Sequence, residues 1–294
     1  MCKGALPPEL AIPSASGLPQ GATILIEHMS GFPSLIVRSI QDALVEQNHR
    51  VCIYDRPGFM LSPQGYAPIS PKAMEEALGD ALANINEHGP YYVIGHHSGS
   101  EYAHIFARTN RLSVVGMSFL YPTASALLGL LSDGIDFAKR KKISSGMVGD
   151  SMIAESTSTL ASLNLQRMLA AIGIWANGFS TEVYPTVGTK SGNNAALTWA
   201  LDNPSMVQAQ YYELLRRQST IQILEEVTNS TSVVFSKELP VILFGVDPTN
   251  ANQRIFLESA DSRYKLEISD ANESQPLRLS QVARQISWHI ARIN

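Results

Sequence analysis

Short apolar runs alternate with longer amphipathic stretches along most of this 294-residue chain. Six runs have the length and the β-branched and aromatic content of strands: Thr23–His28, Arg50–Asp55, Tyr91–Gly95, Ser113–Leu120, Pro240–Gly245 and Tyr264–Ser269. Five other stretches repeat apolar residues at helical spacing: Ser34–Asn48, Lys72–His88, Ser100–Thr109, Asn250–Ser259 and Gln275–Arg292. Strands that alternate with helices in this way predict an α/β fold, with a mostly parallel sheet flanked by helices.

The alternation stops between about Ala124 and Lys237, where the pattern is helical and no convincing strand occurs. We interpret residues 124–236 as a helical cap insertion, residues 23–123 and 237–294 as the core, and residues 1–22 as an N-terminal arm. Five aromatic residues of the cap are candidates to line a substrate pocket: Trp175, Phe179, Tyr184, Trp199 and Tyr211. Such a lining favours an apolar small molecule as the ligand.

Composition and charge exclude several kinds of partner. The chain is 45% hydrophobic and 16% charged, its net charge is −4, and its longest basic run is Lys139–Lys142. Nucleic acid and membranes are therefore not expected partners, and no run approaches the roughly 18 apolar residues of a membrane span. The N-terminal residues lack a signal-peptide pattern, so a cytoplasmic protein is expected. Of the two cysteines, Cys52 is predicted to be a buried, reduced strand residue and Cys2 to lie in a mobile terminus. The oligomeric state is not predicted.

The most informative motif is Gly95-His96-His97-Ser98-Gly99, which lies between a strand and a helix. This is the arrangement of a nucleophile elbow, G-x-S-x-G, except that His97 stands where the serine belongs. A turn centred on Ser98 would place His96 and Ser100 where small residues are needed. The glycines therefore favour His97 at the apex of the turn, and a shift of the apex to Ser98 stays open as an alternative.

Four segments together resemble the α/β-hydrolase superfamily, in its group with a helical cap between the sixth and seventh strands. They read LIEHMSGF, YDRPGFMLS, VIGHHSGSEYAHIFA and LPVILFGVDPTN in chain order. The resemblance implies an oxyanion loop at the first segment, a nucleophile at position 97, a triad acid at Asp247 and a catalytic histidine at or beside Asn272. His97 and Asn272 depart from this pattern, so both the serine and its base are missing. The first two family strands also lack a clear counterpart, so either the sheet is shortened at that edge or a strand precedes Thr23.

An imidazole at the apex suits acid–base chemistry, because imidazole groups titrate near neutral pH. We expect the main-chain N–H groups of Ser98 and Met29 to form an oxyanion hole beside His97, with Asp247 to orient it and His28 as a second imidazole. The alternative for His28 is a structural role or a hydrogen bond to a ligand. Asp55 and Arg56 are expected to tie their loop together by ion pairs and hydrogen bonds.

The leading hypothesis is an enzyme that has lost serine hydrolysis and catalyses a cyclisation, addition, elimination or isomerisation, by analogy in secondary-metabolite biosynthesis. The alternatives are a non-catalytic small-molecule receptor and an esterase-type hydrolase that uses Ser98. Neither metal-ligand spacing nor a glycine-rich phosphate loop is present, so no metal or cofactor is expected.

Overall fold

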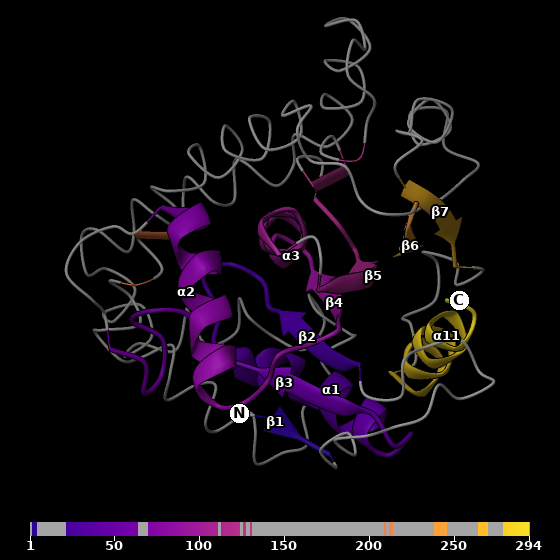
Figure 1. Ribbon diagram of the computed structural model, residues 1–294, viewed down its shortest axis with the longest axis horizontal. Helices are drawn as coiled ribbons and strands as arrows, with labels where there is room; N and C mark the ends of the chain where they lie inside the picture. Colours follow the sequence, from indigo (N-terminus) through magenta and orange to yellow (C-terminus); the bar gives the residue numbers. More distant parts are fainter. Residues whose placement is uncertain are drawn as a thin grey trace, which may run out of the picture.

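A seven-stranded sheet forms the centre of the molecule (Figure 1). The computed structural model describes residues 2–4, 22–63, 70–110, 113–123, 126–127, 130, 209, 212–213, 238–245, 264–269 and 279–293. Its strands are β1 (Cys2–Lys3), β2 (Thr23–Glu27), β3 (Arg50–Ile53), β4 (Tyr91–His96), β5 (Val114–Leu120), β6 (Leu239–Phe244) and β7 (Tyr264–Ile268). Their order is β1-β3-β2-β4-β5-β6-β7, and every pairing except β1 with β3 is parallel. All six predicted strands are confirmed, with small shifts at their ends.

Helices cover both faces of the sheet. They are the 3-10 helix η1 (Ser34–Val37) and the α-helices α1 (Arg38–Val45), α2 (Pro71–Asn84), α3 (Gly99–Thr109) and α11 (Leu279–Ala291). In Figure 1, α2 and α3 lie on one side of the sheet, and α1 and α11 lie together on the other. The start of α2 has a clear local cause, because Ser70 caps the N–H of Ala73 and Pro71 takes a first-turn position that needs no N–H donor.

Alternate residues of each central strand enter two separate cores. Leu25 and Val93 pack with the apolar residues of α2 and α3, whereas Ile24, Ile26 and Ile94 pack with those of α1 and α11. Strands with two apolar faces are typical of parallel sheets that are buried by helices on both sides. This explains why the strands read as continuous apolar runs in the sequence.

The predicted helix at 250–259 and nearly all of the predicted cap lie outside the described residues. The domain boundaries at 22, 123 and 236 therefore stay predictions. Within the described ranges, no helix is long and apolar enough to cross a membrane.

The first strand corrects the prediction made for the cysteines. β1 pairs antiparallel with β3 and places Cys2 opposite Cys52, and the two sulfurs form a disulfide. The predictions of a mobile Cys2 and of reduced thiols are therefore wrong. The cause is the register of the sheet edge, which brings together residues 50 positions apart in the chain. The short β1 also supplies a strand before Thr23 at the edge where the sequence left this question open.

The strand order reverses direction at one position. The chain runs from β2 to β3 on one side and then returns to β4 on the other side of β2. At such a switch point the connections leave the strand ends in opposite directions, and ligands of open α/β sheets bind there. The segments after β2 and β4, which begin at His28 and His97, both leave the sheet at this place.

Candidate functional site

The turn after β4 presents His97 as its apex residue. His97 has a φ of 51°, in the left-handed region that residues with a side chain seldom occupy, and its N–H donates to the carbonyl of Leu120 at 2.8 Å. Ser98 follows directly before α3 with a helical φ of −64° and ψ of −16°, and its side chain makes no capping hydrogen bond to the helix. The structure thus has the apex at His97, as the glycine spacing predicts.

The two glycines of the motif are required by close backbone approaches. A Cβ on Gly95 would lie 2.4 Å from the Cα of Ser100, and a Cβ on Gly99 would lie 2.2 Å from the carbonyl oxygen of Glu27. Neither contact could be relieved by a side-chain rotation, because both neighbours are backbone atoms. At these two glycines the start of α3 lies very close to the backbone of β4 and β2. The strained residue, His97, lies between the two glycines in the chain.

The loop after β2 reaches the elbow through Ser30. The N–H of Ser30 donates to the Oγ of Ser98 at 2.8 Å, so this loop aims a main-chain donor at the position beside the apex. Met29, which the sequence suggested as the donor, is buried, and its carbonyl accepts from Arg56. The oxyanion role of Met29 stays a prediction, whereas Ser30 has the observed contact. Sequence reasoning missed Ser30, although it directly follows Met29 in the same segment.

His28 lies behind this loop and is fully buried. Its ring packs edge-on against Phe59, with the centroids 6.1 Å apart, and at 6.3 Å from the Tyr54 ring. Burial and the neighbouring Arg56 guanidinium hold the pKa of His28 well below its ordinary value, so the imidazole is neutral. Its Nδ1 lies 3.1 Å from a guanidinium nitrogen of Arg56. This is the environment of a structural histidine, and the catalytic role of His28 stays a prediction.

Arg56 is the centre of a buried polar network under the loop. Its Nε donates to Glu213 at 2.5 Å, its Nη1 to Glu27 at 3.3 Å, and its Nη2 to the carbonyls of His28 and Met29 at 2.9 and 3.1 Å. The guanidinium also lies over the Tyr102 ring, 4.6 Å from the centroid. All of these groups are buried, so the cation and its carboxylate partners depend on one another.

The neighbouring Asp55 accepts the N–H of Ser34 at 2.8 Å. Asp55 and Arg56 therefore make ion pairs and hydrogen bonds of the predicted kind, but these side-chain partners lie in the segment after β2, in β2 and at Glu213 rather than within their own loop.

Glu213 is the part of this network that the sequence did not predict. It lies between β5 and β6, 157 residues from Arg56, and no local motif marks it. One carboxylate oxygen accepts from Arg56 and the other accepts the N–H of Gly31 at 2.6 Å. A single buried side chain thus joins a distant segment to the loop that carries Ser30.

Two further carboxyl groups bear on the charge of this network, Glu27 within it and Glu75 close to it. Burial raises the pKa of Glu27 to about 7, although Arg56 and the Tyr54 hydroxyl, which donates to it at 2.9 Å, act in the opposite direction. Burial and the charge of Glu27 raise the pKa of Glu75 well above its ordinary value. Neither oxygen of Glu75 has a hydrogen-bond partner among the described residues. We infer that at least one of these two carboxyls is protonated at neutral pH.

Several predicted site residues lie outside the described part of the chain. These are the proposed acid Asp247, the lost-histidine position Asn272 and the five cap aromatics Trp175, Phe179, Tyr184, Trp199 and Tyr211. Their roles stay predictions.

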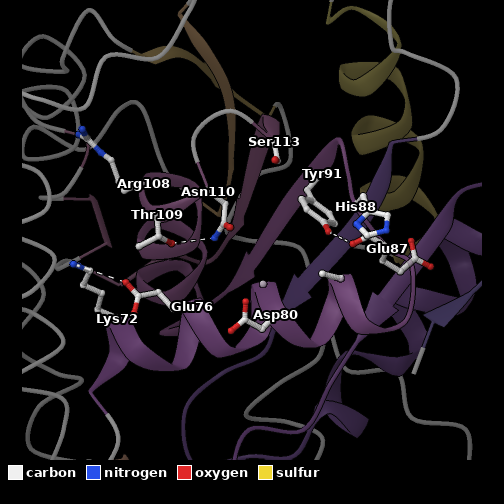
Figure 2. Close-up of a pocket in the computed structure, with 12 residues that line it drawn as sticks. Lys72, Glu76, Asp80, Glu87, His88, Tyr91, Arg108, Thr109, Asn110 and Ser113 are labelled. Carbon is white, nitrogen blue, oxygen red and sulfur yellow. Dashed lines mark hydrogen bonds and ion pairs between the residues drawn. The ribbon is translucent and has the colours of Figure 1, made fainter.

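A separate polar cavity of about 620 Å³ lies between α2 and the end of α3 (Figure 2). Its lining includes charged residues of both signs, among them Lys72, Glu76, Asp80 and His88, and it reaches Tyr91 at the start of β4. Because His97 follows the other end of β4, this cavity is remote from the elbow. Its mixed charges favour no particular ligand.

Among the described residues, Cys2, Cys52 and Glu87 are close enough to share a metal ion. The two sulfurs are joined in the disulfide, and the oxygens of Glu87 accept from Thr23 and Arg50. In this form the three residues have no thiolate to offer a metal.

Comparison with known proteins places the fold. No family model matches the chain. A relative from Schizosaccharomyces pombe, itself described as an uncharacterized protein, is 35% identical over 71 residues. These residues make up 24% of this chain and 13% of the relative, so the chain spans a small part of that protein's length.

Solved structures of epoxide hydrolases, esterases and haloalkane dehalogenases are similar over nearly the whole chain. An esterase from Exiguobacterium antarcticum has a TM-score of 0.59 at 11% identity and covers 92% of both chains. The haloalkane dehalogenase DatA from Agrobacterium tumefaciens has a TM-score of 0.57 at 17% identity, covering 93% of this chain and 90% of its own. This protein has the α/β-hydrolase fold, and the predicted fold class is confirmed.

Proposed function

We propose that this α/β-hydrolase-fold protein is an enzyme that uses His97 for proton transfer and does not hydrolyse its substrate. The observation that carries the proposal is the strained backbone at His97. A φ of 51° between two irreplaceable glycines is the geometry that presents a reactive side chain above the sheet, and here that side chain is an imidazole. Strain of this kind persists where the surrounding structure enforces it, and it is concentrated at functional sites.

The chemistry follows from the groups beside His97. The imidazole removes a proton from a carbon next to a substrate carbonyl. The electron pair of the broken C–H bond forms a C=C bond, and the π pair of the carbonyl moves to its oxygen. Main-chain N–H groups of Ser30 and Ser98 stabilise that oxyanion, and the substrate oxygen takes the place of the Ser98 Oγ, to which the Ser30 N–H donates in the structure. The imidazolium returns the proton to another carbon in an isomerisation or cyclisation, or to a leaving group in an elimination.

The substrate class is inferred from the predicted cap. The predicted cap aromatics favour an apolar molecule, and an apolar carbonyl compound also fits the carbon acidity that this step requires. A role in secondary-metabolite biosynthesis and a cytoplasmic location are further parts of the proposal. The Cys2–Cys52 disulfide counts against the location, since disulfides are more common in oxidising compartments.

Isotope incorporation tests the proposal. The protein is incubated with an apolar metabolite extract from its source cells in D2O, and mass spectrometry records which compounds gain deuterium at carbon. We expect His97→Ala to lower this exchange by about a hundredfold or more, as for other acid–base residues. His88→Ala, at an exposed histidine of the remote cavity, should leave it unchanged. An undiminished exchange in His97→Ala would remove His97 from the reaction.

A hydrolase is the second candidate, because the similar solved structures include esterases and the hydroxyl of Ser98 lies at the loop donor. Hydrolysis would place ¹⁸O from labelled water in a product, and a fluorophosphonate probe would label the wild type but not Ser98→Ala. Our proposal predicts neither result. Tight binding of one extract component without deuterium or ¹⁸O incorporation would instead indicate a receptor.

A further inference from the structure

The carboxylate of Glu213 joins two groups of the loop that carries Ser30. It accepts the Gly31 N–H at 2.6 Å with one oxygen and the Arg56 Nε–H at 2.5 Å with the other. Gly31 directly follows Ser30 and has a φ of 80°, a backbone conformation that a residue with a side chain would disfavour. Arg56 in turn holds the carbonyls of His28 and Met29, so the loop is held at several consecutive residues.

Glu213 is almost completely buried. It lies between β5 and β6 in the chain, and its carboxylate contacts this loop. Glu27 and Glu75 also face the Arg56 cation, but Glu27 belongs to the core strand β2 and Glu75 to α2. Removing the Glu213 charge would leave a buried guanidinium with less compensation, which is costly. The position of residue 213 and the position of the Ser30 N–H are therefore energetically linked.

We propose that Glu213 is a positioning residue that couples Arg56 to the oxyanion loop and thereby orients the Ser30 N–H. With its carboxylate in place, the Ser30 N–H points at the elbow. Without that carboxylate, Gly31 and Arg56 lose their shared acceptor and the donor loses its fixed orientation. This inference rests on the proposed function in one respect, which is the catalytic purpose of the Ser30 donor. The coupling itself can be measured without a substrate.

Glu213→Gln is the direct test. A glutamine amide can accept from only one of the two donors, because its nitrogen faces the other as a second donor. We expect the amide hydrogen exchange of Ser30 and Gly31 to accelerate about tenfold to a hundredfold, which matches the loss of one hydrogen bond to a charged group. Their ¹H–¹⁵N cross-peaks should also shift, while the amides of β4 and β5 keep wild-type exchange.

Glu87→Gln is the matched control. Glu87 is also a buried carboxylate in an ion pair, with Arg50, and it accepts from Thr23 at 2.9 Å, but it contacts the opposite end of the sheet. This variant should lose global stability without a selective effect on Ser30 and Gly31. Equal acceleration in both variants, or unchanged exchange in Glu213→Gln, would overturn the proposal.

Two further variants keep the outcome interpretable. If Glu213→Gln does not fold, Glu213→Asp keeps the charge and shortens the side chain by one methylene, and it should accelerate the same two amides to a smaller extent. Wild-type exchange in a folded Glu213→Asp would then contradict the coupling. His97→Ala should show wild-type exchange at Ser30 and Gly31. An inactive His97→Ala and an uncoupled Glu213→Gln are therefore separate results, and either proposal can fail alone.

Discussion

At the scale of single residues, the elbow shows which positions the sequence determines. Gly95 and Gly99 were sufficient to predict the apex, because each has a backbone atom where a Cβ would stand. Ser30 and Glu213 could not be predicted in the same way. Their importance arises from hydrogen bonds across the fold, one for Ser30 and two for Glu213, and a hydrogen-bonding side chain or amide carries no local mark of its distant partner.

The strain at His97 leads to a prediction about relative stability. Glycine is normally less stable than alanine by about 0.5–1 kcal/mol at ordinary backbone positions, because it loses more entropy on folding. At a φ of 51° the order should reverse. We therefore expect the free energy of unfolding of His97→Gly to exceed that of His97→Ala by about 1 kcal/mol. Urea denaturation of both variants measures the difference.

Ser98 provides the control, since its φ of −64° is ordinary. There, Ser98→Ala should be more stable than Ser98→Gly, and both variants lose the acceptor for the Ser30 N–H equally. If alanine were also the more stable residue at position 97, the left-handed apex would be wrong.

At the scale of elements, apolar period and turn residues were enough to find six strands and the helices that the structure describes. The pairing of β1 was missed because a strand of two residues is too short to show a repeat of apolar positions. Its partner strand, β3, also lies far away in the chain. The helical cap could not be tested in the same way, because nearly all of it lies outside the described residues.

The disulfide at this edge should contribute measurably to stability. It closes a loop of 50 residues, and a cross-link over such a loop is expected to stabilise by about 2–4 kcal/mol. Urea denaturation with and without dithiothreitol should show this difference in the wild type. The Cys2→Ser, Cys52→Ser double variant should behave like the reduced protein in both conditions. A reductant effect that persists in this variant would have another origin.

At the scale of the whole molecule, the buried ionisable groups predict how stability depends on pH. The pKa of Glu27 in the folded chain, about 7, exceeds its ordinary value of 4.5. Between these values the folded state holds the proton that the unfolded state has lost, so this group's contribution falls as pH rises from about 4.5 to 7. His96 acts in the opposite direction, because burial and then its neighbour His97 lower the pKa of His96 to about 3, and its contribution falls as pH drops below 6.5.

Glu27→Gln isolates the first contribution. The stability of the wild type relative to this variant should decline by roughly 2–3 kcal/mol between pH 4.5 and 7 and then level off. Denaturant titrations across that range measure it. Glu76→Gln, at an exposed carboxylate of α2, should show no such decline. A wild-type advantage that grows with pH would mean that Glu27 is ionised and well compensated in the fold.

The two-residue strand β1 also bears on how copies of the chain meet. Without it, β3 would be the edge among the described strands, with a row of unpaired N–H and C=O groups that is a template for edge-to-edge aggregation. A strand of two residues covers part of that row and is too short to recruit a further strand. The Lys3–Asp42 ion pair and the Cys2–Cys52 bond fasten it there. Loss of the Cys2–Cys52 disulfide should therefore first cause self-association at high protein concentration. Any change at the elbow should come later.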